Sequence, residues 1–498
     1  MTDSPCAPSQ IGTRVYCDDD QHAFARLSGD FNPMHTDAVA ARRLITGRRV
    51  VHGIHLLLTA IEYWATNDRH GDAKSHLGFI SCAFDNPVNV GDQVVFTQLP
   101  NTEHQPILEI SVSGLVCTRI VLEFCADHLE LEKPTSSVVG GDAVSGCDNL
   151  EVPLAEAPNF HLNKRYALQI TERTYPSYFP RACQALGTLG VAATAALSYI
   201  VGMVCPGLHS VFSSVTIDLR AEPAPSDILF FSILKYDARF RIFNIGFDGA
   251  LGGTLKAFLR PPPQAQPTVR DLSSSLEPEE FKGTRSLVIG GSRGLGEVTA
   301  KILAAGGGAV TVTYAAGHDD ASAIRNEINS FGHGTCEIKL LDLTAAPCSS
   351  LAIDWKSLDF VFYFATPRIF RKKSNLFDLG VFQEFLDFYI KELYELCVFL
   401  ETTLDHKRIR IYVPSSVYIA ERPRGMAEYA MAKSASEILV QEINRTFKKV
   451  YVLDTRLPRL STDQTTTVLQ STAASNVDAL VPIIRALHTA GSVPQPRA

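Results

Sequence analysis

A glycine-rich loop between a short apolar strand and a helix constrains the C-terminal part of the chain more than any other feature. Ser286–Ile289 is typical of a buried strand, and a helix is predicted over Glu297–Ala305. Between them, the glycines at 290, 294 and 296 allow a tight turn that brings a helix N-terminus close to a pyrophosphate. Short apolar runs then alternate with helical patterns to about residue 490, which predicts βαβ units and a parallel sheet.

Three residues farther along the chain have side chains suited to proton transfer. Tyr429 and Lys433 are four residues apart at the start of a predicted helix, so both side chains lie on one face. A lysine beside a phenol lowers the pKa of the phenol and lets it pass a proton near neutral pH. Ser416 follows a strand predicted over Arg408–Val413, and its hydroxyl is suited to holding a substrate carbonyl.

In this order and spacing, the glycine-rich loop, Ser416, Tyr429 and Lys433 resemble the short-chain dehydrogenase/reductase family over residues 281–490. The resemblance implies a Rossmann-like, doubly wound parallel α/β sheet. It implies that Tyr429 is the acid/base, that Ser416 orients the carbonyl, and that Lys433 also holds the nicotinamide ribose. The residues expected to contact the coenzyme are Gly290, Ser292, Arg293, Gly294, Leu295, Gly296, Tyr314, Asp342, Ala365 and Lys433.

The choice between coenzymes depends on the end of the second predicted strand, Ala309–Thr313. An NAD enzyme usually has an acidic residue there, which binds the ribose 2′-hydroxyl. This chain has Tyr314 at that point and no acid between Val298 and His318, whereas Arg293 is available for a 2′-phosphate. The sequence therefore favours NADP(H).

Several positions depart from the family pattern. Phe364-Ala365-Thr366 replaces the usual Asn-Ala-Gly, Tyr389 stands at the position of the fourth catalytic residue, and Pro458-Arg459 replaces a Pro-Gly turn. No clear final strand is predicted. The sequence therefore does not decide whether the chain has the family's proton relay or its four-helix oligomer contacts. Both a monomer and a homo-oligomer are compatible with it.

The N-terminal part contains a second reactive motif, Ser28-Gly29-Asp30-Phe31-Asn32-Pro33-Met34-His35. The Asn-Pro step predicts a tight turn that holds the Asp30 carboxylate and the His35 imidazole together, where they can position and deprotonate a water molecule. Val51-His52-Gly53 precedes a helix predicted over Ile54–Trp64, and the backbone N–H of Gly53 suits a developing negative oxygen.

These motifs, with Phe84 to Asp92, resemble the MaoC-type hotdog hydratases, the (R)-specific enoyl-CoA hydratases, over residues 10–127. The resemblance implies that Asp30 and His35 activate water for addition to an enoyl thioester. Asn32 would brace the loop at the substrate and oxyanion position, and Gly53 would polarise the thioester carbonyl. A faint repeat relates Phe84–Phe96 to Asp218–Phe231. It predicts an α+β double hotdog in which residues 159–260, which lack the motif, form a second, non-catalytic hotdog.

Two other segments have alternative interpretations. Residues 182–212 contain no charged side chain and are long enough to cross a bilayer, but their glycines, Pro206 and hydroxyl residues favour a buried helix over Cys183–Val204. His52 and His55 are three residues apart, yet no third metal ligand is evident and core or helix-end histidines are favoured. Residues 133–153 are predicted to be a connector, 261–280 a linker, and the tail after Thr489 is predicted to be loose.

The bulk composition excludes several classes of function. A net charge of −7 gives no electrostatic basis for binding nucleic acid or an anionic membrane. The 11 cysteines form no C-x-x-C pair, and the first ten residues do not resemble a secretory signal, so we expect a cytoplasmic protein with free thiols and no metal.

The two motifs are compatible with one pathway, because reduction of a 3-ketoacyl thioester yields the 3-hydroxyacyl thioester that a hydratase interconverts with a 2-enoyl thioester. The sequence therefore predicts a bifunctional enzyme acting on acyl-CoA or acyl carrier protein thioesters. Two alternatives are a ketoreductase whose hotdog pair only binds an acyl carrier, and a non-catalytic thioester-binding scaffold.

Overall fold

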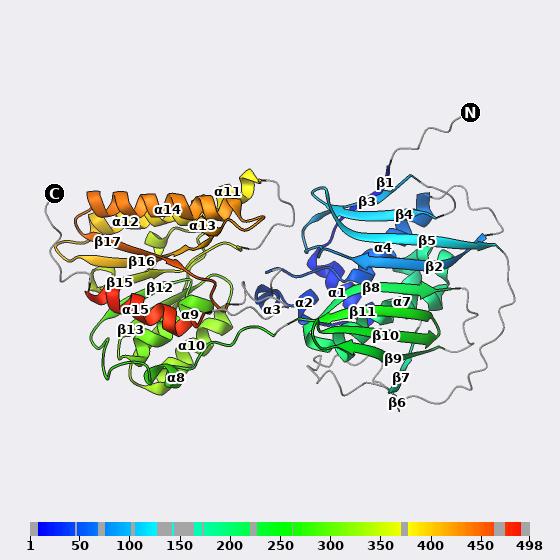
Figure 1. Cartoon of the computed structure of the whole chain (residues 1–498), viewed down its shortest axis with the longest axis horizontal. Coiled ribbons are helices and arrows are strands. Elements are labelled where there is room, and N and C mark those ends of the chain that lie inside the picture. Colours follow the sequence, from blue (N-terminus) through cyan, green and yellow to red (C-terminus); the bar gives the residue numbers. More distant parts are fainter. Residues whose placement is uncertain are drawn as a thin grey trace. The chain divides into compact units, whose positions relative to one another are not determined.

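The chain forms two compact units that divide between Pro262 and Pro263 (Figure 1). The computed structural model describes residues 8–44, 47–67, 75–100, 105–126, 142–143, 164–171, 174–219, 227–260, 262–369, 377–462 and 474–489. The tail predicted after Thr489 and all but two residues of the connector predicted over 133–153 lie outside these described residues.

A sheet of eleven strands forms the N-terminal unit, in the order β1-β3-β4-β5-β2-β8-β11-β10-β9-β7-β6. All its pairings are antiparallel except that of the short β6 with β7. The strands are β1 (Ser9–Val15), β2 (Ser75–Phe84), β3 (Gln93–Gln98), β4 (Ile107–Val112), β5 (Leu115–Ala126), β6 (Asp142–Ala143), β7 (Arg165–Gln169), β8 (Ser210–Asp218), β9 (Ile228–Asp237), β10 (Ile242–Gly249) and β11 (Gly252–Leu259).

The two halves of this sheet repeat one strand order. Counted from the outer side of the sheet toward its centre, the first half has the order β1-β3-β4-β5-β2 and the second half has the order β7-β9-β10-β11-β8. The last strand of each order meets the other at the centre, where β2 pairs antiparallel with β8 and Cys82 lies opposite Val215. The two segments joined by the faint sequence repeat thus occupy equivalent places in the two halves.

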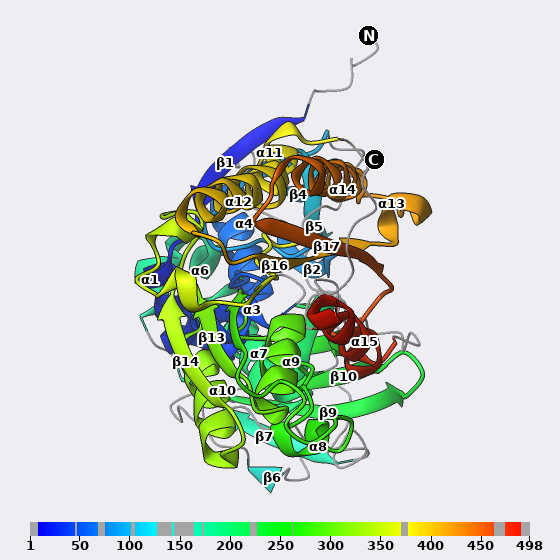
Figure 2. The same ribbon diagram turned by 90° about the vertical axis from the view of Figure 1, so that its left-hand side faces the viewer.

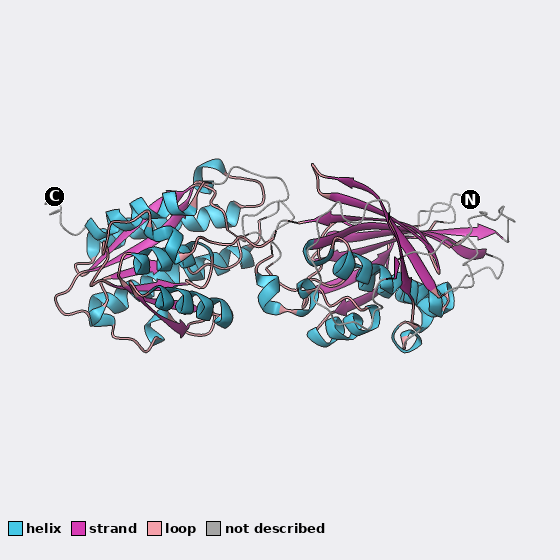
Figure 3. Ribbon diagram, turned by 90° about the horizontal axis from the view of Figure 1, so that it is seen from below, coloured by secondary structure: helices cyan, strands magenta, loops and turns pink. Residues whose placement is uncertain are grey.

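Helices cover one face of the sheet, as Figure 3 shows. Along the strands, buried and partly exposed residues alternate, as in β10, where Phe243, Ile245 and Phe247 are buried. Such alternation is typical of an antiparallel sheet with one covered face. The helices are α1 (Asp18–Ser28), α2 (Pro33–Thr36), α3 (Ala38–Arg42), α4 (Gly53–Asn67), α5 (Tyr175–Tyr178), α6 (Pro180–Leu186), α7 (Thr188–Tyr199), the π-helical turn η1 (Ile200–Val204) and the 3-10 turn η2 (Gly207–His209).

The uncharged segment at 182–212 is buried from Val191 to Met203, but it is not the single helix predicted over Cys183–Val204. Gly187 has φ 75° and ψ 154°, which ends α6 and starts α7 in a new direction. Residues Val191–Tyr199 of α7 are all buried. No single helix in the described residues is long and apolar enough to span a membrane. Among these residues, only α6 and Thr188–Val204 taken together have the required length and apolar character, and the two helices meet at a bend of 104°.

The C-terminal unit is built on a parallel six-stranded sheet with the order β14-β13-β12-β15-β16-β17. The chain adds strands toward one edge from β12 to β14 and then crosses back to β15, from which it adds strands toward the other edge. The order in which strands are added therefore reverses between β12 and β15. The strands are β12 (Arg285–Ile289), β13 (Ala309–Tyr314), β14 (Thr335–Leu340), β15 (Phe360–Tyr363), β16 (Ile409–Ser416) and β17 (Val450–Leu457).

Helices cover both faces of this parallel sheet (Figure 2). One core contains side chains of α9, α10 and α15, and the other contains side chains of α12 and α14. All four residues of β15 are buried, as expected for a strand covered on both sides. The helices are α8 (Val269–Ser273), α9 (Gly294–Ala305), α10 (His318–Phe331), α11 (Leu379–Leu386), α12 (Glu392–Thr403), α13 (Tyr418–Glu421), α14 (Ala427–Thr446) and α15 (Asn476–Thr489), with the 3-10 turns η3 (Cys348–Ser350) and η4 (Trp355–Ser357) and the π-helical turn η5 (Asp387–Lys391).

The linker predicted over 261–280 extends too far, because a helix within this range packs on the C-terminal unit. Thr268 caps α8 through a reciprocal hydrogen-bond pair with Asp271, and Val269 and Leu272 are buried in the core beside α9. Glu280 also pairs with Arg485 of α15. The proline and serine content of this segment indicated a linker, but two apolar residues at helical spacing fix most of it to the C-terminal unit.

Candidate active sites

The loop that carries Asp30 and His35 is shaped by local hydrogen bonds. Gly29 ends α1 with φ 82°, a left-handed conformation that suits glycine. The backbone N–H of Asn32 then donates to Asp30 Oδ1 at 3.1 Å, and the Met34 N–H donates to Asn32 Oδ1 at 3.1 Å. Asn32 thus caps α2, in which His35 is the third residue. The predicted turn therefore brings the carboxylate and the imidazole to one side.

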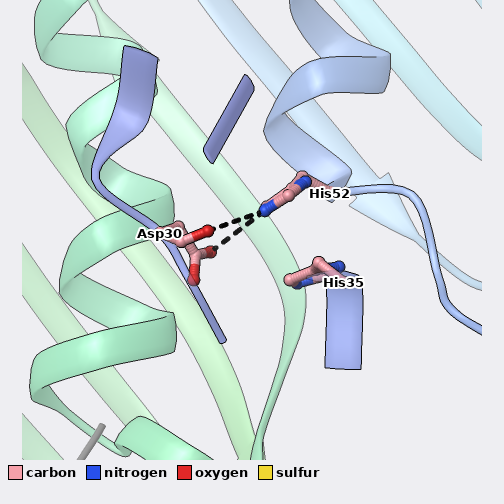
Figure 4. A group of neighbouring side chains, drawn as sticks. All are labelled: Asp30, His35 and His52. Atoms are coloured by element: carbon pink, nitrogen blue, oxygen red, sulfur yellow. Dashed lines mark hydrogen bonds and ion pairs between the residues drawn. The ribbon is translucent and has the colours of Figure 1, made fainter. Parts of the chain in front are cut away.

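A third residue, His52, completes this cluster just before α4 (Figure 4). The rings of His35 and His52 stack with centroids 3.8 Å apart. His52 Nε2 lies 3.0 Å from the backbone oxygen of Asp30 and 4.0 Å from its Oδ2. The sequence interpretation of His52 as a helix-end or core residue missed this contact, although the Val51-His52-Gly53 motif contained the signal.

The second half of the sheet supplies the remaining contacts of the loop. Ser198 of α7 donates its hydroxyl to Asp30 Oδ2 at 2.6 Å. Asn32 donates its side-chain amide to the backbone oxygen of Gly202 at 2.8 Å, with longer contacts to Gly207 and Leu208. A Cβ atom at Gly202 would lie 2.2 Å from Asp30 Oδ1, so only glycine fits beside the carboxylate. No motif in the sequence indicated Ser198 or Gly202.

Asn32 therefore has the geometry of a positioning residue, as its predicted bracing of the loop requires. Its side chain is completely buried, its amide binds backbone oxygens of the second half, and its Oδ1 accepts from Met34. Both polar atoms of this side chain thus help to hold the loop in place.

Burial disfavours the charged forms of the two reactive groups. It raises the pKa of Asp30, against the opposing effects of His35 and the hydrogen bond from Ser198. It lowers the pKa of His35, against the opposing effects of Asp30 and of the bond to Val50. Because a neutral His35 donates from Nδ1 to the Val50 oxygen at 2.6 Å, its Nε2 carries a lone pair that can accept a proton.

Burial also lowers the pKa of His52 far below its usual value, so this ring is neutral. Its Nε2–H donates to the Asp30 carbonyl, and Nδ1 must then accept a hydrogen bond. The side-chain amide of Gln21 lies 3.2 Å from His52 Nδ1. When the NH2 group of this amide faces His52 Nδ1, the buried Gln21 Nε2 gains a hydrogen-bond partner. His52 is thus fixed in one tautomer, under the Asp30 backbone.

Asp30, His35 and His52 each have one atom that could bind a metal ion, and these three atoms lie within 4.8 Å of one another. The sequence analysis paired His52 with His55 and did not reveal this group. However, both nitrogens of His52 and Nδ1 of His35 are engaged with protein groups. These bonds must break before His52 can bind a metal. His55 points elsewhere, since its ring stacks on Phe24 at 4.5 Å in the core.

Gly53 is the first residue of α4, so its N–H belongs to the first turn and has no partner within the helix. A Cβ at this position would lie 3.0 Å from the ring of Phe84. The predicted role of Gly53 as an oxyanion donor is compatible with this geometry and stays a prediction.

The reductase candidates Ser416, Tyr429 and Lys433 come together in the C-terminal unit. Ser416 is the last residue of β16, whereas Tyr429 and Lys433 occupy successive turns of α14. All three are buried, with 8%, 8% and 5% of their surfaces exposed. Ser416 and Tyr429 are linked by a side-chain hydrogen bond, and Lys433 Nζ donates to the Pro414 oxygen at 2.7 Å.

The expected effect of Lys433 on the phenol is wrong for this structure. Burial raises the pKa of Tyr429 to about 12, and only the Ser416 bond opposes it. Lys433 Nζ is 6.0 Å from the centre of the Tyr429 ring, so its charge does not offset burial of the phenol. Burial also lowers the pKa of Lys433 to about 7.

Tyr389, which stands at a departure from the family pattern, lies directly on Lys433. The ammonium is 3.7 Å from the centre of the Tyr389 ring, within the range of a cation–π interaction. Tyr389 lies in η5, and its hydroxyl is 2.5 Å from Thr366 Oγ1, just beyond β15. An aromatic ring therefore lies against the lysine at a position where the sequence departs from the family pattern that it resembles.

The glycine-rich loop forms a narrow cradle at the switch between β12 and β15. Gly290 has φ 77°, and a Cβ there would lie 2.9 Å from the backbone nitrogen of Ala365. A Cβ on Gly296 would lie 2.5 Å from the Gly290 oxygen. The backbone thus approaches closely where α9 begins at Gly294. This cradle fits a dinucleotide pyrophosphate, which binds at such a helix N-terminus.

The other predicted coenzyme contacts are distributed around the cradle. Arg293 precedes α9, and Ser292 is 5% exposed. Tyr314 ends β13 and packs edge-on against His318 at 5.5 Å. Asp342 is exposed and its Oδ1 accepts hydrogen bonds from the backbone and hydroxyl of Thr344, so part of its capacity serves a local turn. The side chain of Leu295 instead packs against the core, so only its backbone is suited to the predicted contact.

A family model described as MaoC like domain matches residues 7–105. The N-terminal part of the chain contains a MaoC-like domain. The matched region includes Asp30, His35, His52 and Gly53, and it ends before β4. No curated protein matches the chain.

The chain is also similar to several solved structures over 42% of its length. One is FolM alternative dihydrofolate reductase 1 from Brucella canis complexed with NADP, at 16% identity over 89% of that chain. Two are short-chain dehydrogenases, from Burkholderia cenocepacia in complex with NADP at 21% identity and from Serratia marcescens at 20%, each over 91% of that chain. All three have a TM-score of 0.35, which is too low to transfer a ligand or an activity.

Proposed function

We propose that the chain is a bifunctional acyl-thioester enzyme. Its C-terminal unit would reduce 3-ketoacyl thioesters to 3-hydroxyacyl thioesters with NADPH, and its N-terminal unit would interconvert these with 2-enoyl thioesters. The observation that carries the proposal is the presence, in one chain, of a buried Asp30–His35 pair within a MaoC-like domain and a buried Ser416–Tyr429–Lys433 group beside a nucleotide cradle. The two chemistries share one intermediate.

The repeated strand order supports a double hotdog for the N-terminal unit, with the catalytic groups in its first half. The order of the parallel sheet, with the cradle at its switch point, supports a Rossmann fold for the C-terminal unit.

In the hydratase half-reaction, His35 Nε2 takes a proton from water as the water oxygen bonds to C3 of the enoyl thioester. Asp30, whose pKa is raised by burial, starts protonated and gives its proton to C2; the proton held by His35 then passes to the Asp30 carboxylate, which returns both groups to their starting states. The Gly53 N–H binds the thioester oxygen, on which negative charge accumulates. Dehydration is the reverse of these steps.

In the reductase, Tyr429 gives its phenolic proton to the substrate carbonyl oxygen, which the Ser416 hydroxyl holds. Lys433, whose ammonium donates to the Pro414 oxygen, would hold the nicotinamide ribose. The cradle at 290–296 and Ala365 would hold NADPH, whose chemistry there is to supply a hydride to the carbonyl carbon. The absence of an acid at the end of β13 and the position of Arg293 before α9 favour the 2′-phosphorylated coenzyme.

Mass spectrometry of products formed from a 3-ketoacyl thioester and NADPH tests the whole proposal. Wild-type protein should yield 3-hydroxyacyl and 2-enoyl products. Tyr429→Phe should stop both, because a lost acid/base group costs about 10²–10⁴-fold.

Hydration of an added enoyl thioester must accompany this assay, since water favours the hydroxyacyl product. A reductase with a non-catalytic hotdog pair gives no hydration at all, and a scaffold oxidises no NADPH. Each of these results would replace the proposal by the corresponding alternative.

A further inference from the structure

A cation from the second half of the N-terminal sheet lies against the Asp30–His35 loop. Arg260 follows β11, and its Nη2 donates to the backbone oxygen of Leu208 at 3.3 Å. The same oxygen lies 3.4 Å from the side-chain amide of Asn32. The guanidinium and the catalytic loop are therefore anchored to one carbonyl group.

Among the residues that the structure describes, this guanidinium has no anionic partner. Over the described ranges, no carboxylate oxygen lies within 4.0 Å of Arg260, and its buried Nε has no hydrogen-bond partner. Arg165 and Arg119, on other strands of the same sheet, pair with Asp248 and Glu109. Burial lowers the pKa of Arg260 to about 10, so it is still charged at neutral pH. A partly buried charge without an anionic partner is incompletely compensated, which makes a ligand anion the natural complement.

The charge of Arg260 reaches the reaction site. After burial, it contributes to the lowered pKa values of His35 and of His209. The Arg260 backbone N–H donates to the His209 oxygen at 2.9 Å, and His209 Nδ1 is a second buried nitrogen without a partner. Two adjacent residues of the second half thus present unpaired nitrogen atoms near the catalytic loop.

We propose that Arg260, assisted by His209, binds an oxyanion of the thioester substrate in the hydratase site. Arg260 is only partly buried, so a substrate can reach it. This inference rests on the proposed hydratase function, and it assigns to the second half a role in substrate selection. The oxyanion has two possible sources: a carboxylate on the acyl group, or the phosphate that the pantetheine arm carries in both coenzyme A and acyl carrier protein.

Calorimetric titration of unreactive saturated thioesters tests the proposal without requiring turnover. The three probes are butyryl-N-acetylcysteamine, which has neither anion, butyryl-CoA, which has phosphates, and glutaryl-CoA, which also has a terminal carboxylate. Arg260→Gln should weaken binding of the recognised probes on the order of 10- to 100-fold, and Arg260→Lys should weaken it less. Loss for both CoA probes identifies the phosphate, whereas a loss confined to glutaryl-CoA identifies the carboxylate.

Arg241→Gln is the matched control. It removes the same charge from a neighbouring turn. The charge of Arg241 contributes to the lowered pKa of His209 but not to that of His35. This control should bind all probes like the wild type. Equal affinities of wild type and Arg260→Gln for every probe, or an equal loss for all three including the uncharged one, would overturn the proposal. Parallel hydration assays with the corresponding enoyl thioesters report separately on the hydratase, because their failure in wild type leaves the binding result intact.

Discussion

The two candidate sites differ in how much of the chain is needed to build them. Asp30 and Ser198, which share a hydrogen bond, are separated by 168 positions, and Asn32 and Gly202 by 170. In the C-terminal site, Lys433 and its acceptor Pro414 are only 19 positions apart. The first site depends on the pairing of two structural repeats, and the second largely on one strand and the helix that follows it. Changes in residues far from the first motif should therefore disable hydration alone.

Burial has parallel electrostatic effects in the two sites. It raises the pKa of the acids Asp30 and Tyr429 and lowers the pKa of the bases His35 and Lys433. The sites differ in the compensation: hydrogen bonds from Ser198 and the Asn32 backbone support the charged form of Asp30, whereas Lys433 has one carbonyl and the ring of Tyr389.

The largest effect that separates the sites is expected for Asp30→Asn. This change removes the proton-transferring group, so hydration should fall about 10²–10⁴-fold while reduction by NADPH persists. Rates of enoyl-thioester hydration and of NADPH oxidation by the same preparation check both halves of the prediction. Undiminished hydration would remove Asp30 from the mechanism.

Gly202→Ala should produce the next largest loss, although Gly202 belongs to the second half. The new Cβ would lie 2.2 Å from Asp30 Oδ1 and must displace the carboxylate. A misplacement of about 1 Å costs roughly 10²-fold in rate, so hydration should fall by about that factor.

Gly190→Ala serves as the control for this change, because its Cβ would meet Leu186 at an ordinary 3.5 Å. Hydration rates and thermal melting of both variants should be compared. Equal rates would show that the glycine beside Asp30 is not needed for catalysis.

Arg293→Ala tests coenzyme selection in the C-terminal site. Wild-type kcat/KM should be higher with NADPH than with NADH, and loss of the guanidinium should narrow the ratio about tenfold by weakening a charge-assisted hydrogen bond to the 2′-phosphate. Fluorescence titration with each coenzyme gives an independent measure of binding. Equal use of both coenzymes by the wild type would refute the assignment to Arg293 and Tyr314.

The smallest effect concerns Tyr389 and pH. Reduction should decline as pH rises through about 7, because a neutral Lys433 loses the charge-assisted hydrogen bond by which it would hold the nicotinamide ribose. Tyr389→Leu removes the ring that favours the cation, so this decline should move to lower pH by up to about one unit. Tyr389→Phe keeps the ring and should retain the wild-type profile. Identical pH profiles of the Leu and Phe variants would exclude a role for the ring.

Local sequence patterns predicted the parts of each site that are close in the chain. The Asn-Pro turn placed Asp30 beside His35, and the four-residue spacing placed Tyr429 and Lys433 on one face of α14. Ser198 was not predictable, because a serine within an apolar helix has no pattern that marks the carboxylate it meets. The pKa of Tyr429 was predicted in the wrong direction, since spacing does not reveal how deeply a phenol is buried or that Lys433 is bonded to Pro414.

The antiparallel seam between β2 and β8 has a consequence for how this protein can vary. In a twofold-symmetric dimer of identical chains, every substitution appears in both copies and must be tolerated in both environments. Here the seam joins two repeats of one chain, so each position mutates independently. The first repeat can keep the reactive pair unchanged while the second, which has no such pair, acquires Ser198, Gly202 and Arg260 around it. Covalent fusion thus separates the constraint on chemistry from the freedom to alter what the site accepts.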